Sequence, residues 1–218
     1  MKSNMKSTIS HTLSAILLVV SLVSPAGSVK ASRPRPKPDL PLDQLLPLAV
    51  VDINQYWQTN FSSLRLRYVV PNIVRYDRPI ATPCGASLMK NATYCAASNS
   101  IYFDYNWISS VYSNVGDYAA VSIMAHEWGH LVQTQLGLSN GTVFSIQNEL
   151  GADCFSGAYT KYAEVTGKLE EGDMEEAGAG LFNSGDPRGM PWFAQGAHGK
   201  PMQRINAFLS GYNGGRCF

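Results

Sequence analysis

Two short stretches of the chain hold residues whose types and spacing could do chemistry. Residues 126–130 read His-Glu-Trp-Gly-His, and residues 149–153 read Glu-Leu-Gly-Ala-Asp. On an α-helix, residues four apart lie only about 40° apart around the axis and about 6 Å apart along it. His126 and His130 therefore point the same way and can hold one metal ion. Glu127 lies about 100° from His126, beside the metal, where a general base for a metal-bound water belongs.

Glu149 and Asp153 complete the predicted centre. They are also four residues apart, so both face the same side of their helix. Two histidines and one glutamate leave a zinc position open to water, which is a catalytic arrangement, because structural zinc sites are normally closed by four protein ligands. We predict one Zn²⁺ bound by His126, His130 and Glu149. Glu127 is then the catalytic base. Asp153 is predicted to accept the outer N–H of one ligating histidine and fix its orientation.

The surroundings of the first stretch favour a metal site over a chance occurrence of so short a pattern. The residues next to His130 are uncharged and lie within a helical apolar pattern. The chain has four histidines, and His11 falls in the N-terminal leader, so two of the remaining three belong to the stretch. Trp128 is predicted to pack against the back of the helix, and Gly129 to relieve crowding between helices.

The remaining histidine, His198, is a second candidate catalytic residue. It could donate a hydrogen bond to the oxyanion of a tetrahedral intermediate, opposite the zinc. The alternative is an exposed loop histidine or a helix-cap contact. Tyr105, Tyr159 and Tyr162 are other possible donors, which the sequence does not rank.

The N-terminus resembles a secretory signal peptide. Lys2 and Lys6 precede an apolar run at residues 13–23, and small residues follow at positions suited to cleavage after Ala31. The run is about eleven residues long, well short of the roughly 20 needed to cross a bilayer, so no permanent membrane span is expected. We predict a signal peptide at 1–31, a proline-rich linker at 32–42 and one domain at 43–218. The mature protein is then exported, to the periplasm or the medium.

The charge balance argues against nucleic acid as a partner. The whole chain has 17 basic and 16 acidic residues. Removal of residues 1–31 takes away three lysines and no acids, which leaves 14 basic against 16 acidic residues. A slightly acidic chain without clusters of basic and aromatic residues offers little to a phosphate backbone. A peptide or protein substrate is the expected partner.

Four cysteines remain in the exported protein, and an even number in an oxidising compartment favours disulfides. Three pairings are possible, and we favour Cys84 with Cys95 and Cys154 with Cys217. The alternative is a zinc–thiolate site, which the absence of a close Cys-x-x-Cys pair disfavours.

Local patterns place these residues on a series of helices and strands. A helix beginning near Pro47 is predicted within residues 43–60, then a strand pair at 64–70 and 72–76 and a further strand at 99–105. A helix from Asp117 ends at Gly137, and the next has Ser145 as its N-cap and ends near Gly167. A weakly helical stretch at 173–182 and a last helix from Pro201 complete the chain.

Three stretches resemble the neutral zinc metallopeptidase family of bacteria, within the gluzincin group of zincins. They are Met-Ala-His-Glu-Trp-Gly-His-Leu-Val-Gln at 124–133, Asn-Glu-Leu-Gly-Ala-Asp-Cys-Phe-Ser-Gly at 148–157 and His-Gly-Lys-Pro-Met-Gln-Arg at 198–204. The resemblance covers roughly residues 64–218. It implies a small α+β zincin fold, with a short antiparallel or mixed sheet packed on the active-site helix and the helices that follow. It also implies the same zinc ligands and Glu127 as the catalytic glutamate.

The function that the resemblance and the residues indicate is an exported zinc-dependent endopeptidase. Two alternatives stay open: a zinc-containing binding or scaffold protein without turnover, and an amide hydrolase acting on a cell-wall substrate. Glu127 favours catalysis, because a protein that has lost turnover often loses this residue first. In zincins the strand before the active-site helix commonly binds the substrate backbone at its edge, so residues 99–105 are a candidate for this role. The alternative is a core strand with no free edge.

Overall fold

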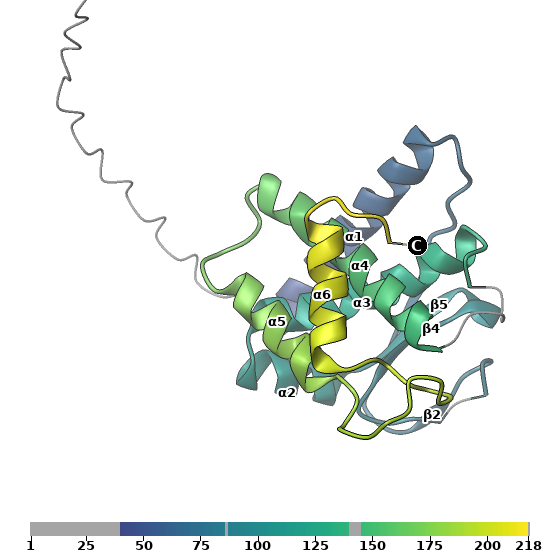
Figure 1. The fold of residues 1–218 in the computed structure, drawn as a ribbon. Helices are drawn as coiled ribbons and strands as arrows, with labels where there is room; N and C mark the ends of the chain where they lie inside the picture. Colours follow the sequence, from purple (N-terminus) through teal and green to yellow (C-terminus); the bar gives the residue numbers. More distant parts are fainter. Residues whose placement is uncertain (1–39, 86, 140–144, 218) are drawn as a thin grey trace, which may run out of the picture. The chain divides into compact units, whose positions relative to one another are not determined.

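The computed structural model describes residues 40–85, 87–139 and 145–217. The predicted signal peptide, and the predicted linker up to residue 39, lie outside the described residues. Six α-helices are found in the described part of the chain (Figure 1): α1 Leu42–Ser63, α2 Tyr105–Asn114, α3 Asp117–Gln135, α4 Ser145–Val165, α5 Asp173–Asn183 and α6 Pro201–Tyr212. The helices predicted from Asp117, Ser145 and Pro201 are confirmed, and the weakly helical stretch is α5.

Three strands form a mixed sheet in the order β1-β5-β4. Strand β5 (Ser100–Asp104) pairs in parallel with β1 (Asn72–Tyr76) and antiparallel with β4 (Ala92–Cys95). Two short strands, β2 (Ile80–Ala81) and β3 (Ser87–Leu88), form a separate antiparallel pair, and a 3₁₀ turn, η1 (Ala96–Ser98), joins β4 to β5. The predicted α+β class is therefore confirmed, with the sheet of the mixed kind.

Helix α3 is the centre of the hydrophobic core. It packs against α1, α2, α4 and α5, and most of its side chains are buried. A helix that is apolar on nearly all sides belongs inside a protein. Trp128 is buried on the side of α3 away from His126 and His130 and donates a hydrogen bond from Nε1 to the Tyr68 hydroxyl, 3.0 Å away. The interpretation of Trp128 as a packing residue is thus confirmed.

Glycines let α4 approach α3 on one side and α6 on another at backbone distance. A Cβ added to Gly129 would lie 2.6 Å from the carbonyl oxygen of Ala152, so the predicted role of Gly129 between helices is confirmed. Gly157 and Gly211 do the same between α4 and α6, where an added Cβ would lie within 2 Å of a carbonyl oxygen of the facing helix. Figure 1 shows α6, in yellow, lying across α4 and alongside α5. Side chains from α3 and α6 can therefore both reach side chains of α4.

The prediction that the first helix begins near Pro47 is wrong, because α1 begins at Leu42 and contains Pro47. A proline inside a helix removes one hydrogen bond and costs about 3 kcal/mol. Leu42 and Leu46 are buried on the same face as Ile53. Burial of each leucine stabilises the fold by about 1.5–3 kcal/mol, which outweighs the lost bond.

The predicted strand at 64–70 is also wrong. Leu64, Leu66 and Val70 are exposed, and the segment makes no ladder with β1. The side chain of Gln135 holds it instead: its Oε1 accepts from the Val69 N–H at 3.0 Å, and its Nε2 donates to the Val69 carbonyl at 2.7 Å. The alternation of apolar and polar residues at 64–70 therefore belongs to a surface segment that the Gln135 amide holds, and not to a strand of the sheet.

The candidate substrate-binding edge at 99–105 needs a correction. Strand β5 is the central strand, with a partner on each side, and Ser100, Ile101, Tyr102 and Phe103 are all buried. It has no free edge, as the alternative held. The strand with an unpaired edge next to α3 is β4.

Both predicted disulfides are present, one between Cys84 and Cys95 and one between Cys154 and Cys217. The first joins the loop after β2 to the end of β4. The second ties the C-terminal tail to α4, the helix that carries Glu149. Within the described residues, no helix combines the length and the apolar character needed to cross a membrane.

Candidate metal centre

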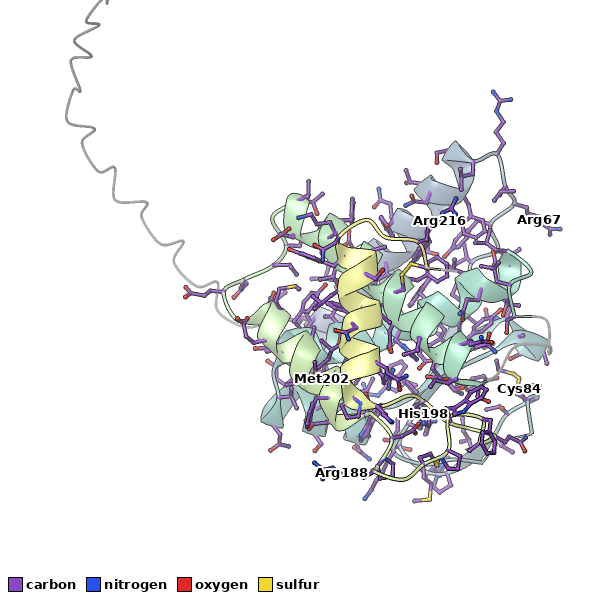
Figure 2. All side chains as sticks on the ribbon, viewed as in Figure 1. Arg67, Cys84, Arg188, His198, Met202 and Arg216 are labelled. Carbon is purple, nitrogen blue, oxygen red and sulfur yellow. A yellow bond between two sulfur atoms is a disulfide. The ribbon has the colours of Figure 1, made fainter. Side chains whose placement is uncertain are left out.

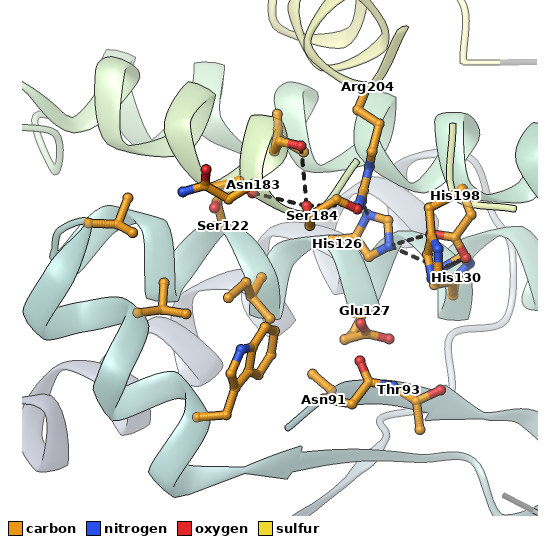
Figure 3. A pocket seen from close by; sticks show the side chains of 18 residues that line it. Asn91, Thr93, Ser122, His126, Glu127, His130, Asn183, Ser184, His198 and Arg204 are labelled. Atoms are coloured by element: carbon orange, nitrogen blue, oxygen red, sulfur yellow. Dashed lines mark hydrogen bonds and ion pairs between the residues drawn. The ribbon is translucent and has the colours of Figure 1, made fainter. Parts of the chain in front are cut away.

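Three predicted ligand side chains meet at the junction of α3 and α4. The Nε2 atoms of His126 and His130 lie 3.2 Å apart. Glu149 places Oε2 3.2 Å from the first of these nitrogens and Oε1 3.4 Å from the second. Figure 3 shows the two imidazoles turned toward each other, with Glu127 on the neighbouring side of the pocket. The structure thus brings together the residues that the spacing selected.

The donor set fits a zinc ion. Ligands bound at 2.0–2.1 Å in tetrahedral directions are about 3.3–3.4 Å apart, close to the three separations found here. Both Nε2 atoms point lone pairs at the same place, and a carboxylate adds negative charge beside them. Such a convergence is repulsive without a cation between the groups. Imidazole nitrogen and carboxylate oxygen are donors that zinc accepts.

The outer nitrogen of each histidine is held by a different side chain. Nδ1 of His126 lies 2.7 Å from Oδ1 of Asp153, and the buried carboxylate can only accept, so Nδ1 carries the proton. Nδ1 of His130 lies 3.1 Å from Oε1 of Gln133, whose Nε2 donates to the Asn148 carbonyl at 2.8 Å. Both imidazoles are therefore fixed with Nε2 as the free donor atom toward the metal position.

The charges around His126 favour a cation at this position. Burial lowers the pKa of His126, but the carboxylates of Asp153 and Glu149 outweigh burial and raise it to about 10. Burial raises the pKa of Glu149, and the two imidazoles more than reverse this and hold it well below its ordinary value. The pKa of Asp153 is lowered in the same way, with burial opposed by His126 and Arg204. Proton and metal compete for the same nitrogen.

Glu127 is buried beside the ligands and does not join them. Its Oε2 accepts a hydrogen bond from the backbone N–H of Tyr94 on β4, at 2.7 Å. In an antiparallel pair the N–H and C=O of one residue point to the same side. The Tyr94 N–H therefore lies on the free edge of β4, and Glu127 is oriented by the strand that borders the pocket.

The pocket is a cavity of about 410 Å³ that begins at the ligand atoms and continues between α2, α3 and α5. The polar side chains that line it include the ligands, Glu127, His198 and Arg204. Apolar side chains from α2, α3 and α5 and from the residue after α2 also line it: Trp107, Val111, Val115, Ile123 and Leu181.

His198 lies at the mouth of the pocket, and its side chain is about half exposed. Figure 2 shows it beside the start of α6. Its Nδ1 lies 3.5 Å from the Asp186 carboxylate. Among the described residues that line the pocket, the three tyrosines considered as donors do not occur. The Tyr159 hydroxyl, for example, donates to Asp52 at 2.9 Å, and the Tyr105 ring stacks under the guanidinium of Arg75.

Sequence reasoning missed three contributors to the site: Tyr94, Gln133 and Arg204. Arg204 forms a double hydrogen bond with Asp153, from Nε to Oδ2 and from Nη2 to Oδ1, each 2.8 Å long. Gln133 and Arg204 belong to two of the stretches that resemble the metallopeptidase family. The resemblance therefore marks both residues but does not indicate what they contact. Tyr94 acts through its backbone, which leaves no signal in residue type.

The comparisons with known proteins agree with this chemistry. The family model described as "Putative neutral zinc metallopeptidase" matches residues 23–217. The chain is 32% identical over 184 residues to the uncharacterized protein YpfJ of Escherichia coli K12, covering 73% of this chain and 63% of that protein. It is 30% identical over 177 residues to the uncharacterized protein Rv2575 of Mycobacterium tuberculosis, covering 68% and 60%.

The chain thus spans less than two thirds of the length of these curated relatives. No solved structure is significantly similar to it. The family match extends over most of the chain and includes all the residues of the metal centre. The chain belongs to the neutral zinc metallopeptidase family.

Proposed function

We propose that this protein is an exported zinc-dependent endopeptidase, with residues 43–218 as its catalytic domain. The observation that carries the proposal is the placement of Glu127: a buried carboxylate, outside the ligand set, oriented by the Tyr94 N–H at the wall of the same cavity. A protein that only stored or displayed zinc would have no need for an oriented acid at this place.

His126, His130 and Glu149 would hold the metal. Bound zinc supplies a Lewis acid that polarises a carbonyl and lowers the pKa of a water to about 7. Glu127 then takes a proton from the attacking water and delivers it to the leaving amine. His198, at the mouth of the cavity, is proposed as a donor to the developing oxyanion.

The free edge of β4 is proposed to align the substrate. Ala92 lies two residues before Tyr94 on β4, so its backbone N–H and C=O point in the same direction, away from β5 and toward the cavity. An extended peptide could add to this edge by main-chain hydrogen bonds. The apolar residues that line the cavity suit an apolar side chain of such a peptide. These features support a peptide over a sugar or nucleotide as substrate.

Export is supported by the two disulfides, which persist in oxidising compartments. The predicted signal peptide at 1–31 supplies the route. Protein located in the medium or periplasm, with an N-terminus near residue 32, would agree with this part of the proposal. Retention in the cytoplasm with residues 1–31 intact would contradict it.

The decisive experiment compares Glu127→Gln with His126→Ala, with Glu164→Gln on the exposed face of α4 as the control. Glu127→Gln should retain one zinc per chain and lower the hydrolysis of an unfolded protein by about 10²–10⁴-fold. His126→Ala should lose both zinc and hydrolysis, and the control should lose neither. Wild-type protein that binds zinc and cleaves no peptide or protein would favour a binding protein. Release of products from isolated cell-wall material alone would favour the cell-wall amide hydrolase.

A further inference from the structure

Residues 198–204 form a family-like stretch whose purpose the proposed chemistry does not explain. His198 and Arg204 are the two residues of the stretch that line the cavity, and the half-exposed side chain of His198 is not among the candidate metal ligands. At the other end of the stretch, Arg204 is 4% exposed although arginine is among the residues that are almost never fully buried without a partner. A buried guanidinium at the back of a metal centre needs an explanation.

Arg204 is connected to the centre through one carboxylate. Asp153 is fully buried, and its Oδ1 lies 2.7 Å from Nδ1 of His126 and 2.8 Å from Nη2 of Arg204. Its Oδ2 accepts from Nε of Arg204 at 2.8 Å. Nη2 also lies 3.4 Å from Nδ1 of His126. The imidazole, the carboxylate and the guanidinium form a continuous chain from the metal position to α6.

The rest of the stretch places Arg204. The backbone N–H groups of His198 and Gly199 both donate to the Asp186 carboxylate, at 3.1 and 2.8 Å. Pro201 is the first residue of α6, and the Gln203 side chain accepts from the Lys200 N–H at 2.9 Å. These contacts fix where α6 begins, so Arg204 falls in its first turn and faces α4.

The end of α5 fixes the other side of the guanidinium. Nη1 of Arg204 donates to the carbonyl oxygen of Ser184 at 3.1 Å and to its hydroxyl at 2.8 Å. The planar fork of arginine is thereby held at both ends and presents two parallel N–H groups to Asp153. A lysine could supply the charge but not this double contact.

We propose that Arg204 is a positioning residue of the metal centre, which clamps Asp153 so that the carboxylate holds His126 with Nε2 turned toward the metal. The inference rests on the proposed zinc site and adds a role for the third stretch. Arg204 lines the cavity but is not one of the candidate metal ligands, and its double hydrogen bond is made to Asp153. Its effect should therefore appear in metal affinity and metal geometry before it appears in substrate binding.

The test measures zinc affinity of the full-length protein by competition with a chromophoric chelator. Loss of an outer partner of a ligating histidine typically weakens metal binding 10–100-fold. We expect Arg204→Gln to bind zinc about tenfold more weakly than wild type. The zinc affinity of Arg204→Lys should lie between those of Arg204→Gln and the wild type. Arg75→Gln, which removes a surface ion pair with Asp43, is the matched control and should bind zinc as wild type does.

A second measurement separates positioning from general loss of structure. If Arg204 acts through Asp153, the double variant Asp153→Asn/Arg204→Gln should bind zinc no more weakly than the weaker single variant. The visible spectrum of the Co²⁺-substituted Arg204→Lys protein should differ from that of wild type, because coordination geometry determines it. If Arg204→Gln does not fold, the zinc affinities of Arg204→Lys and of the double variant still test the inference.

Several results would overturn the inference. Folded Arg204→Gln protein with wild-type zinc affinity and a raised KM alone would make Arg204 a substrate contact. Additive losses in the double variant would show that Arg204 acts independently of Asp153. If wild-type protein binds no zinc, the proposed function falls together with this inference. If the wild-type protein binds zinc and the variants bind it equally well, this inference is wrong and the proposed function is unaffected.

Discussion

At the scale of single residues, the candidate metal centre depends on two acceptors of different kinds. Asp153 holds His126 with a charged carboxylate, whereas Gln133 holds His130 with a neutral amide. A Cβ added to Gly151 would lie 2.3 Å from Nε2 of Gln133, so the amide fits only because α4 has no side chain there. The orientation of His130 therefore depends on a glutamine and on a glycine of the opposite helix.

Gln133→Leu should weaken zinc binding by about 10–100-fold, because the Nδ1–H of His130 loses its acceptor and the ring is free to turn. Gln135→Leu is a matched control on the same helix, since the Gln135 amide binds Val69 far from the ligands. Titration with zinc in the presence of a competing chelator measures both. Equal affinities for the two variants would contradict the assigned role of Gln133.

The shared face of His126 and His130 could be predicted because helical spacing determines which side chains point the same way, and the same rule pairs Glu149 with Asp153. The meeting of the two faces depends on the packing of α3 against α4. Arg204 could not be predicted in this way, because it lies 51 residues beyond Asp153 and reaches it only through the packing of α6 on α4. Local periodicity says nothing about contacts across such a separation.

At the scale of elements, the distance between α3 and α4 determines whether Glu149 reaches the histidines. Gly129 sets this distance, because its missing side chain lets the backbone of Ala152 come within contact. The same device recurs between α4 and α6 at Gly157 and Gly211. Three helices packed at backbone distance hold the ligands and their outer partners in place.

Gly129→Ala should destabilise the protein and weaken zinc binding together. The new Cβ would lie 2.6 Å from the Ala152 carbonyl oxygen, so α3 and α4 must separate, at a cost of about 1–3 kcal/mol. Gly178→Ala in α5 is the control: no atom lies within 4 Å of its added Cβ, so it should stabilise the helix by about 0.5–1 kcal/mol. Denaturant unfolding with and without zinc measures both. A destabilised Gly129→Ala protein with unchanged zinc affinity would show that the ligands tolerate the separation.

The element predictions failed where the burial of a segment was misjudged. Residues 64–70 alternate as a strand does, but they lie at the surface, held by Gln135. Residues 99–105 were expected to offer an edge, and burial on both faces makes β5 the central strand. Alternation predicts extended backbone better than it predicts which neighbours a strand has.

At the scale of the whole molecule, α3 is the helix against which α1, α2, α4, α5 and β4 pack. Its first residue follows Gly116, which offers no side-chain cap, and α5 supplies one instead: Oε2 of Glu176 accepts from the Tyr118 N–H at 2.9 Å. The disulfide from Cys154 to Cys217 adds a covalent link between α4 and the tail after α6. The core, the Glu176 cap and the disulfide therefore stabilise the helices that carry the candidate ligands, without contacting the ligand atoms.

The Glu176 cap makes the stability of the molecule depend on pH. Burial, together with the nearby acids Asp117 and Asp173, raises the pKa of Glu176 to about 6, against the opposing hydrogen bond from the Tyr118 N–H. A raised acid pKa means that the folded state binds more protons than the unfolded state between about pH 4.5 and 6. The contribution of Glu176 to stability is therefore fully present below pH 4.5 and is lost as the pH rises through 6.

Glu176→Gln keeps an oxygen to accept the Tyr118 N–H but cannot ionise. Relative to wild type, its free energy of unfolding should rise between pH 4.5 and 6 and then stay level. The gain should be about 1 kcal/mol, below the roughly 2 kcal/mol that the pKa shift alone implies, because solvent screens a partly exposed carboxylate. Glu175→Gln, the same substitution at an exposed position of the same helix, is the matched control. A constant difference between Glu176→Gln and wild type across this range would mean that Glu176 ionises alike in the folded and unfolded chain, and that α5 caps α3 without linking its stability to pH.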